Sequence, residues 1–326
     1  MYNQFYGLNT SPFVLTPDTR FLVMTETHCN AKAGLIYSIT SGKGFTVLTG
    51  DAGTGKTTLL RSVIKSIPAE RLCFSLLVHP DLTPDEFSDM AVSDFGLGRG
   101  MSKTERLRKL QEYLLEVHEA GKIAVLFVDE AHRLSAETLE EIRLWTNFES
   151  ETKKLLQIVL VGQDELDGLL NRRELRQLKQ RVEVRLHIGH LSAEEVPVYI
   201  AHRWTRAGGS RQPFSSAAIR LICQFSAGIP RLINTICDNA LVLGFAGGAP
   251  IITEEHVSEA TRDLHLTSAN SKLTTIKEER TVQKIESRSA VGLELEVPAP
   301  VAHRYNDHPL SLFQSTKPKR GWWRAS

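Results

Sequence analysis

Residues 50–57 read GDAGTGKT and contain three glycines, two threonines and a lysine. This order matches the phosphate-binding pattern G-x-x-x-x-G-K-[ST], in which a flexible backbone turns successive N–H groups toward one anion. Such a loop binds the phosphates of a nucleoside triphosphate. The residues that we expect to surround the phosphates are Gly50, Asp51, Ala52, Gly53, Thr54, Gly55, Lys56, Thr57 and Thr58.

Two side chains of this loop have separate expected roles. Lys56 would reach the β- and γ-phosphates, and the hydroxyl of Thr57 would ligate Mg²⁺. A chance match in a glycine-rich turn is the alternative. The flanking sequence argues against chance, because the apolar run GFTVLT precedes the loop and the helical pattern TTLLRSVIKS follows it.

The apolar run in KIAVLFVDE ends in two acidic residues, Asp129 and Glu130. Asp129 would hold Mg²⁺, mainly through a water molecule, and Glu130 would polarise the attacking water. The alternative for Glu130 is that it only caps the following helix. The expected cofactors are therefore ATP and Mg²⁺, and the expected reaction is ATP hydrolysis.

Residues 129–132 spell DEAH, the motif that names a class of helicases. A helicase of that class needs a second α/β domain of similar size and a Ser-Ala-Thr-like segment after the next strand. The sequence contains neither, so we do not interpret the chain as a helicase. For His132 we expect a structural role, with sensing of the nucleotide or of a partner as the alternative.

Three further polar side chains are candidates for contact with phosphate. Gln163 follows the apolar run LLQIVLVG and would point its amide at the γ-phosphate if that strand lies beside the carboxylate strand. Among the arginines of RRELRQLKQR, Arg181 is our choice for a cation supplied to a neighbouring subunit's nucleotide, and Arg176 is the second choice. Arg231 begins a helix in SAGIPRLIN, where the helix dipole disfavours a cation. We therefore expect Arg231 to reach the phosphates, with a salt bridge inside the helical bundle as the alternative.

These side chains require a scaffold of alternating strands and helices. Apolar runs of strand length occur at residues 45–49, 72–78, 123–128, 156–161 and 182–186, and helical patterns occur at residues 57–66, 104–120 and 135–149. Most of the strand runs do not alternate with polar residues, which is typical of strands buried on both faces of a parallel sheet. The alternation predicts an α/β fold with a parallel five-stranded sheet.

The strand pattern stops near residue 191. Four helical patterns follow, at residues 192–207, 215–227, 230–246 and 253–264, and Ser192, Ser215 and Thr253 are the expected caps. We therefore predict an α/β core over residues 1–190 that includes an N-terminal segment, a helical lid domain over residues 191–265, and a disordered basic tail over residues 266–326.

Charge and composition favour a globular protein without a bulk attraction to nucleic acid. The net charge is +1, although the residues from His265 onward hold 10 Lys/Arg against 6 Asp/Glu. We find no signal-peptide pattern and no apolar run of about 20 residues that could span a membrane. The four cysteines form no CxxC motif, so we expect buried free thiols in a reducing compartment. The expected location is the cytoplasm.

The order of these motifs along the chain resembles that of an AAA+ ATPase. More narrowly, the segments FYGLNTSPFVLTPDTRFL, GKGFTVLTGDAGTGKTTLL, LEEIRLWTNFE, LLQIVLVGQDEL, LRQLKQRVEVRL and SAGIPRLINTICDNAL resemble the ExeA/GspA family over residues 1–264. Those proteins are bacterial AAA+ ATPases of general secretion and of related pilus and envelope-assembly systems. The resemblance implies that Gln163 is sensor 1, Arg181 the arginine finger and Arg231 sensor 2. It also implies a homo-oligomer, a ring or a filament, with shared ATP sites and a partner in the envelope machinery.

The sequence departs from that family at two places. Residues 78–80 are Val-His-Pro where similar proteins often carry Asn-Pro, so no switch role is assigned there. Secretion members usually continue into a transmembrane helix and a peptidoglycan-binding domain, whereas this sequence ends in KPKRGWWRAS. Basic residues followed by tryptophans resemble the cytoplasmic flank of a membrane span, and we expect at most a weak contact with the inner membrane. The alternative function is a nucleic-acid-associated AAA+ ATPase such as a transposition regulator, although the nearly neutral body disfavours DNA.

Overall fold

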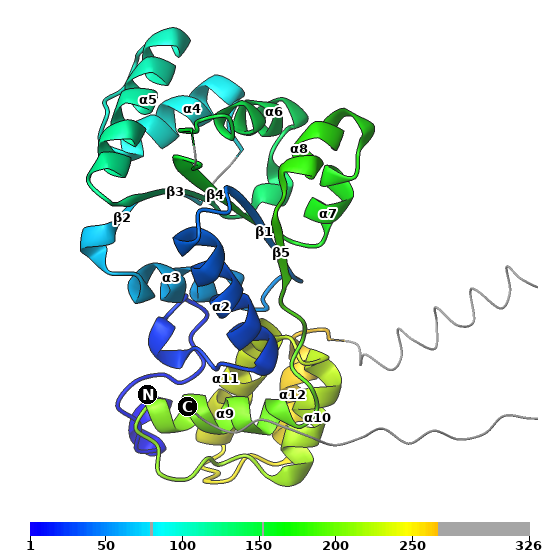
Figure 1. Ribbon diagram of the computed structural model, residues 1–326. Coiled ribbons are helices and arrows are strands. Elements are labelled where there is room, and N and C mark those ends of the chain that lie inside the picture. Colours follow the sequence, from blue (N-terminus) through cyan, green and yellow to red (C-terminus); the bar gives the residue numbers. More distant parts are fainter. Residues whose placement is uncertain (79–80, 152, 267–326) are drawn as a thin grey trace, which may run out of the picture. The chain divides into compact units, whose positions relative to one another are not determined.

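The computed structural model describes residues 1–78, 81–151 and 153–266. Its centre is a parallel five-stranded sheet with the strand order β2-β3-β4-β1-β5 (Figure 1). The strands are β1 (Phe45–Thr49), β2 (Leu72–Leu77), β3 (Ile123–Val128), β4 (Leu156–Val161) and β5 (Val184–His187). The predicted α/β class and the all-parallel sheet are confirmed.

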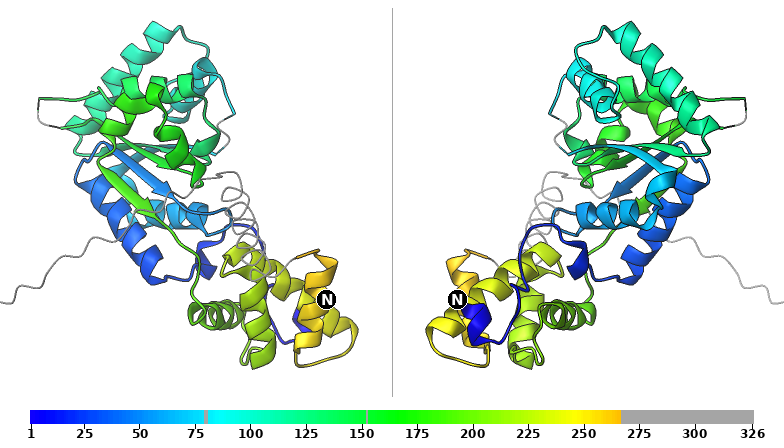
Figure 2. Two further views of the ribbon diagram at one scale, coloured as in Figure 1. Left: turned by 90° about the vertical axis from the view of Figure 1, so that its right-hand side faces the viewer. Right: turned by 90° about the vertical axis from the view of Figure 1, so that its left-hand side faces the viewer.

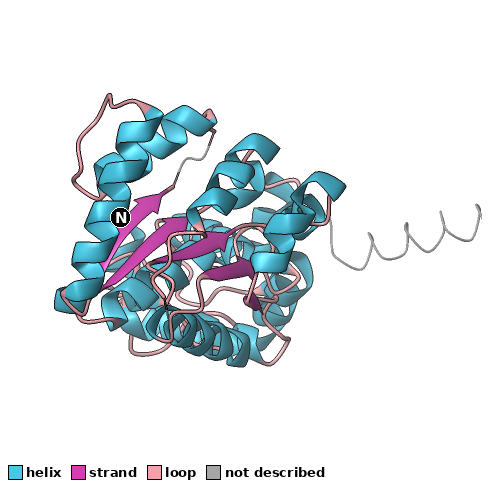
Figure 3. Cartoon of the chain, turned by 45° about the horizontal axis from the view of Figure 1, so that its top comes forward, coloured by secondary structure: helices cyan, strands magenta, loops and turns pink. Residues whose placement is uncertain are grey.

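The burial of each strand explains its sequence. All residues of β1 and β4 are buried, and so is β3 from its second residue onward. Strands covered on both faces need continuous apolar side chains, because neither face meets water. The edge strands β2 and β5 contain half-buried and exposed residues, and β5 begins at Val184, two residues later than predicted. Figure 3 shows the strands running in one direction.

Helices cover both faces of the sheet (Figure 2). On one face α2 (Glu26–Thr40) and α3 (Lys56–Ser66) pack in a core with Leu48, Phe127 and Val161. On the other face the helices pack around Val47, Leu126 and Leu160. These helices are α4 (Pro84–Asp94), α5 (Lys103–Glu119), α6 (Ala136–Trp145), α7 (Glu165–Leu170) and α8 (Arg176–Arg181).

The sequence interpretation missed three of these helices and a short one, α1 (Tyr2–Phe5). Helix α4 begins with a capping box, in which the side chain of Thr83 accepts from the N–H of Glu86 and the Glu86 carboxylate accepts from the N–H of Thr83. This signature is visible in the sequence and could have identified the helix. Helices α7 and α8 have six residues each, too few for a clear period.

Four helices follow the sheet: α9 (Glu195–Arg206), α10 (Ser216–Ser226), α11 (Pro230–Ala246) and α12 (Glu254–Asp263). Ser215 is the N-cap of α10, as expected, and accepts from the N–H of Ala218. Ser192 accepts from the N–H of Glu195, but the N-cap of α9 is Glu194, so the cap expected at Ser192 was two residues early. These helices share a hydrophobic core of their own.

The N-terminal segment contributes to the core of the helical part. Leu8, Phe13 and Phe21 belong to the cluster that contains Trp204 and Ile233. The sequence interpretation grouped residues 1–43 with the α/β part, whereas these apolar side chains are buried among helices α9–α12. The segment therefore connects the two parts of the fold rather than only preceding the first strand.

The described residues include four free cysteines, of which only Cys237 is fully buried. The expectation of buried thiols is wrong for Cys29, which is exposed. Within the described ranges, no helix has both the length and the apolar character needed to cross a membrane. The His79-Pro80 position and the predicted tail beyond Leu266 lie outside the described residues.

Candidate active site

The loops that follow three neighbouring strands meet at one edge of the sheet. Strands β3, β4 and β1 are adjacent and parallel, so their carboxyl ends lie side by side. The phosphate loop follows β1, Asp129 follows β3, and Gln163 lies two residues beyond β4. The strand adjacency on which the interpretation of Gln163 depended is therefore present.

Left-handed backbone at the glycines shapes the phosphate loop. Gly50, Gly53 and Gly55 have φ angles of 153°, 83° and 99°, a region that side chains with a Cβ rarely adopt. Space is also restricted, because a Cβ at Gly50 would lie 2.4 Å from the carbonyl oxygen of Ile188. Gly55 is the N-cap of α3, so the loop delivers the helix N-terminus to the place where phosphates bind.

Lys56 lies inside this loop and is buried. Its ammonium donates to the carbonyl oxygens of Gly50, at 2.7 Å, and Asp51, at 2.8 Å. Burial lowers the pKa of Lys56, while the nearby carboxylates of Glu130 and Asp129 oppose that shift. A phosphate oxygen offers this ammonium a stronger acceptor than a carbonyl, which fits the expected contact.

Thr57 and Asp129 are in direct contact. The hydroxyl of Thr57 donates to the carboxylate of Asp129 at 2.6 Å. Asp129 is buried, and this burial raises the pKa of its carboxyl group even though the bond from Thr57 acts in the opposite direction. Hydroxyl and carboxylate oxygens at this spacing are the hard ligands that Mg²⁺ prefers, so the residues fit the expected ion.

Glu130 adopts an unusual backbone conformation at the end of the carboxylate strand. Its φ of 54° is left-handed, which for a residue other than glycine indicates a constrained position. Glu130 begins the short turn η3 (Ala131–Arg133), yet its side chain makes no capping hydrogen bond. The side chain instead lines the pocket described below. The alternative that Glu130 only caps a helix therefore finds no support in the contacts.

His132 contacts two of the predicted site residues. The backbone N–H of Gln163 donates to Nδ1 of His132 at 3.3 Å, and Nε2 of His132 lies 3.1 Å from the side-chain amide nitrogen of Gln163. The same Nε2 lies 3.6 Å from a carboxylate oxygen of Glu130. The sequence interpretation favoured a structural role for His132. Its position between Gln163 and Glu130 was missed, because spacing along the chain does not show which side chains meet across strands.

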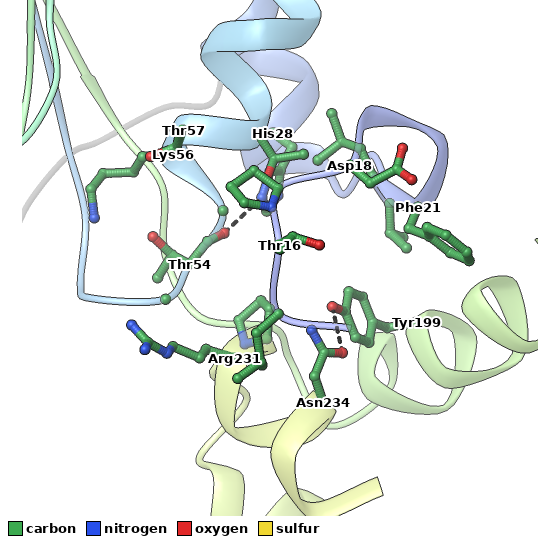
Figure 4. A pocket seen from close by; sticks show the side chains of 18 of the residues that line it. Thr16, Asp18, Phe21, His28, Thr54, Lys56, Thr57, Tyr199, Arg231 and Asn234 are labelled. Atoms are coloured by element: carbon green, nitrogen blue, oxygen red, sulfur yellow. Dashed lines mark hydrogen bonds between the residues drawn. The ribbon is translucent and has the colours of Figure 1, made fainter. Parts of the chain in front are cut away.

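A pocket of about 420 Å³ extends from the phosphate loop to helices α9 and α11 (Figure 4). A cavity of this size is typical for a small-molecule ligand such as a nucleotide. Its lining includes residues 52–58 of the loop, together with Glu130, Gln163 and Arg231. Most of the predicted phosphate-contacting residues therefore surround one cavity.

The N-terminal segment forms a wall of the same pocket, which the sequence interpretation did not foresee. Residues 14–18 and 21–23 line it. Arg203 of α9 fixes the segment, because its side chain donates to the carbonyl oxygens of Pro12, at 2.6 Å, and Val14, at 3.1 Å. The Arg203 guanidinium also lies 4.9 Å from the ring centroid of Phe21. A carbonyl-binding arginine has no local sequence signature that could have predicted this contact.

Two histidines connect the phosphate loop to its surroundings. His28 of α2 is buried, with Nε2 3.1 Å from the carbonyl oxygen of Thr54 (Figure 4). Its Nδ1 lies 2.7 Å from the hydroxyl of Thr25. His190, in the connection between β5 and α9, places Nε2 2.6 Å from the carboxylate of Asp51. His28 thus holds the loop backbone at Thr54, and His190 holds the side chain of Asp51, from elements that the sequence motif does not include.

Arg231 lies at the start of α11 against the phosphate loop. Its backbone N–H donates to the carbonyl oxygen of Gly53 at 3.2 Å, and its side chain lines the pocket. Within the residues that the structure describes, Arg231 makes no salt bridge. These contacts therefore do not support the alternative that Arg231 forms an ion pair inside the helical bundle.

Arg181 lies away from this pocket. It ends α8 just before β5, and because β5 runs parallel to β1, that position is at the sheet edge opposite the phosphate loop. Its guanidinium donates to the side chain of Asn147 at 3.0 Å. Arg181 is thus not brought together with the other site residues of its own chain.

The comparisons with known proteins agree with this geometry. The chain matches the AAA domain family over residues 39–170. General secretion pathway protein A of Aeromonas hydrophila is 40% identical over 262 residues, which is 80% of this chain and 48% of that protein. The chain thus contains an AAA domain and is related to general secretion pathway protein A. It spans about half the length of this relative.

Solved structures of other proteins share the fold of this chain. The Aeropyrum pernix ORC1 protein in complex with DNA has a TM-score of 0.59 at 18% identity, over 78% of this chain and 69% of that chain. The Aeropyrum pernix ORC2 protein in ADPNP–ADP complexes has a TM-score of 0.56 at 16% identity, over 74% of this chain and 68% of that chain. At such identities the similarity concerns the fold alone.

Proposed function

We propose that this AAA+ ATPase uses Mg²⁺ to hydrolyse ATP in the pocket above the phosphate loop, and that turnover powers assembly or remodelling in a bacterial secretion, pilus or envelope polysaccharide-export system. The observation that carries the chemistry is the 2.6 Å contact between Thr57 and Asp129, with Glu130 next in the chain and facing the same pocket. The pathway rests on the 40% identity with general secretion pathway protein A.

Binding begins at the phosphate loop. The N–H groups of residues 50–58 and the N-terminus of α3 hold the phosphates, and the Lys56 ammonium exchanges its two carbonyl partners for phosphate oxygens. Negative charge from the phosphates compensates the buried cation. Thr57 and Asp129 hold Mg²⁺, which when bound neutralises charge on the phosphates.

Hydrolysis requires a water molecule aimed at the γ-phosphate. The Glu130 carboxylate accepts a hydrogen bond from this water and draws off its proton as the water attacks. The Gln163 amide contacts the γ-phosphate and reports its presence. Arg231 approaches the phosphates from α11, so that the helical lid domain, residues 191–265, changes position with the nucleotide.

Arg181 acts on the nucleotide of a neighbouring copy. Its place at the sheet edge opposite its own phosphate loop leaves another subunit's site as the one that it can serve. A guanidinium supplied in this way stabilises the negative charge that develops on the transferred phosphoryl group. The active species is therefore a homo-oligomer, ring or filament, with ATP sites shared between subunits.

The client is a protein of the envelope machinery, and the ATPase works in the cytoplasm, peripherally at the inner membrane. The pathway assignment is tested by measuring the ATPase rate with anionic liposomes and, separately, with duplex DNA. Stimulation by liposomes supports the envelope role. Stimulation by DNA alone would instead favour a nucleic-acid-associated ATPase.

The chemistry is tested with Lys56→Ala. This variant should lose at least about a hundredfold in ATP affinity, because a charge-assisted contact with two phosphates is removed. A matched control is Lys65→Ala, whose ammonium lies in the last turn of α3 and donates to Thr19 at 3.0 Å. Retained tight binding by Lys56→Ala would contradict the site.

A further inference from the structure

His132 lies between the residue proposed to sense the γ-phosphate and the residue proposed to polarise water. Its imidazole is within 3.3 Å of the backbone nitrogen of Gln163, 3.1 Å of the Gln163 side-chain amide and 3.6 Å of the Glu130 carboxylate. The His132 side chain is 14% exposed, so water competes little for these contacts. One ring therefore touches groups at the ends of two adjacent strands, β3 and β4.

The backbone fixes the tautomer of this ring. Because the N–H of Gln163 donates to Nδ1, Nδ1 is an acceptor and the proton of the neutral imidazole is on Nε2. The Nε2–H group faces the Gln163 amide, whose oxygen and nitrogen exchange places by a half-turn. With the oxygen turned toward His132, the amide accepts this proton at the 3.1 Å position.

The Nε2–H group has a second acceptor in reach. A carboxylate oxygen of Glu130 lies 3.6 Å away, slightly beyond a normal hydrogen bond. A small rotation of either side chain would close that gap. One donor with two acceptors can serve only one of them well at a time, so the positions of Gln163 and Glu130 are linked through His132.

The surrounding backbone holds this arrangement in place. Glu130 has a left-handed φ of 54°, and the turn η3 is closed by the Arg133 N–H, which donates to the Glu130 carbonyl oxygen at 3.0 Å. A Cβ at Gly162 would lie 3.1 Å from the backbone nitrogen of His132. The end of β4 and the turn after β3 are thus in close contact, with little room for His132 to move elsewhere.

We infer that His132 is a positioning residue that couples the γ-phosphate contact of Gln163 to the orientation of Glu130. When the Gln163 amide turns to the γ-phosphate, it releases the Nε2–H group of His132. That group then donates to the Glu130 carboxylate and fixes it toward the attacking water. When the phosphate is lost, the amide returns to His132 and Glu130 is no longer held. No proton is transferred by His132.

This inference rests on the proposed roles of Gln163 and Glu130, and the test separates the two levels. His132→Ala should bind ATP with an affinity within about twofold of the unsubstituted protein, while kcat falls about tenfold, as expected for losing a hydrogen bond to a charged group. His132→Gln, which retains an N–H donor, should lose less. The melting temperature is measured for each variant. If His132→Ala does not fold, the kcat and ATP affinity of His132→Gln are used for the test instead.

The control is Arg133→Ala in the same turn. Arg133 pairs with Asp81 on the exposed surface and does not line the pocket. It should leave kcat unchanged. An unchanged kcat in His132→Ala, or a loss of ATP affinity that parallels a drop in melting temperature, would overturn the coupling role and leave His132 as a structural brace.

Double variants make the test specific. In a Glu130→Gln background, His132→Ala should cause no further loss of kcat, because the group that it positions is already inactive. In a Gln163→Ala background, the fold-decrease in kcat of the double variant should be smaller than the product of the two single fold-decreases. A fold-decrease equal to that product would overturn the inference. If Glu130→Gln alone keeps full turnover, the proposed function fails first, at the assignment of Glu130.

Discussion

The backbone N–H of Arg231 donates to the carbonyl oxygen of Gly53 at 3.2 Å, so the first turn of α11 rests directly on the phosphate loop. The contact is close, because a Cβ at Gly53 would lie 2.5 Å from Cβ of Arg231. A change in the loop on nucleotide binding would therefore displace the start of α11. This contact is the structural basis for proposing that the lid responds to ATP.

Gly53→Ala should weaken ATP binding about tenfold. The new methyl group would strain a left-handed residue and push α11 away from the loop, and local strain of this kind costs about 1–3 kcal/mol. Isothermal titration with a non-hydrolysable ATP analogue measures the effect. The matched control is Gly98→Ala, which has a similar φ of 97° but open space around it. Equal affinities for the two variants would argue against a functional contact between loop and lid.

Arg181 offers a test of shared sites. Arg181→Ala and Glu130→Gln should each have little ATPase activity alone, whereas a mixture should recover part of it. In the mixture, an interface can combine an intact Glu130 from the first variant with an intact Arg181 from the second. The rate is measured across mixing ratios at constant total protein. Absence of recovery at every ratio would count against an arginine supplied between subunits.

Arg176 provides the comparison for that experiment. It is exposed at the start of α8, on the same short helix as Arg181. Arg176→Ala should keep its activity if Arg181 alone serves the neighbouring nucleotide. If Arg176→Ala is inactive and is rescued by Glu130→Gln while Arg181→Ala remains active, the role belongs to Arg176 instead.

His28 should make stability depend on pH. Burial lowers its pKa below the ordinary value of 6.5, because a charged imidazole is poorly solvated there, and the hydrogen bond to the Thr54 carbonyl opposes this shift without cancelling it. The unfolded chain then binds more protons than the folded one once the pH drops below about 6.5. The stabilisation by His28 is therefore present above that pH and is lost as the pH falls through the folded pKa.

His28→Gln should reduce this dependence. The variant is expected to be about 1 kcal/mol less stable at pH 7, because hydrogen bonds to Thr25 and Thr54 are weakened. Its free energy of unfolding should then decline less between pH 7 and pH 5 than that of the unsubstituted protein, by up to about 1.4 kcal/mol per pH unit. Urea unfolding at both pH values checks this, and parallel declines would contradict it.

The sequence was most informative where burial is complete. Strands β1, β3 and β4 begin and end at the predicted residues, because continuous apolar runs between turns leave little choice of boundary. Edge strand β5 was placed two residues early, since Val182 packs against the core without joining the strand. The phosphate-loop motif correctly located one end of the pocket, because the loop needs glycines at its positions of positive φ and the sequence shows them.

Other parts of the site could not be predicted, because they depend on contacts across the fold. The N-terminal segment lines the pocket only after Arg203 has fixed the carbonyl groups of Pro12 and Val14. The contacts of His132 depend on Gln163, which is 31 positions away and follows the end of the neighbouring strand β4. Neither relationship has a periodicity or a spacing that the sequence alone would display.

The central claim is that Glu130 polarises the attacking water while the loop around Lys56 and Thr57 binds ATP. The most direct test measures ATP affinity and kcat on the same preparation of Glu130→Gln. The account predicts that this nearly isosteric change leaves affinity within about threefold and lowers kcat by about a hundredfold or more. Turnover at the unsubstituted rate would contradict the account, because another group would then have to activate the water.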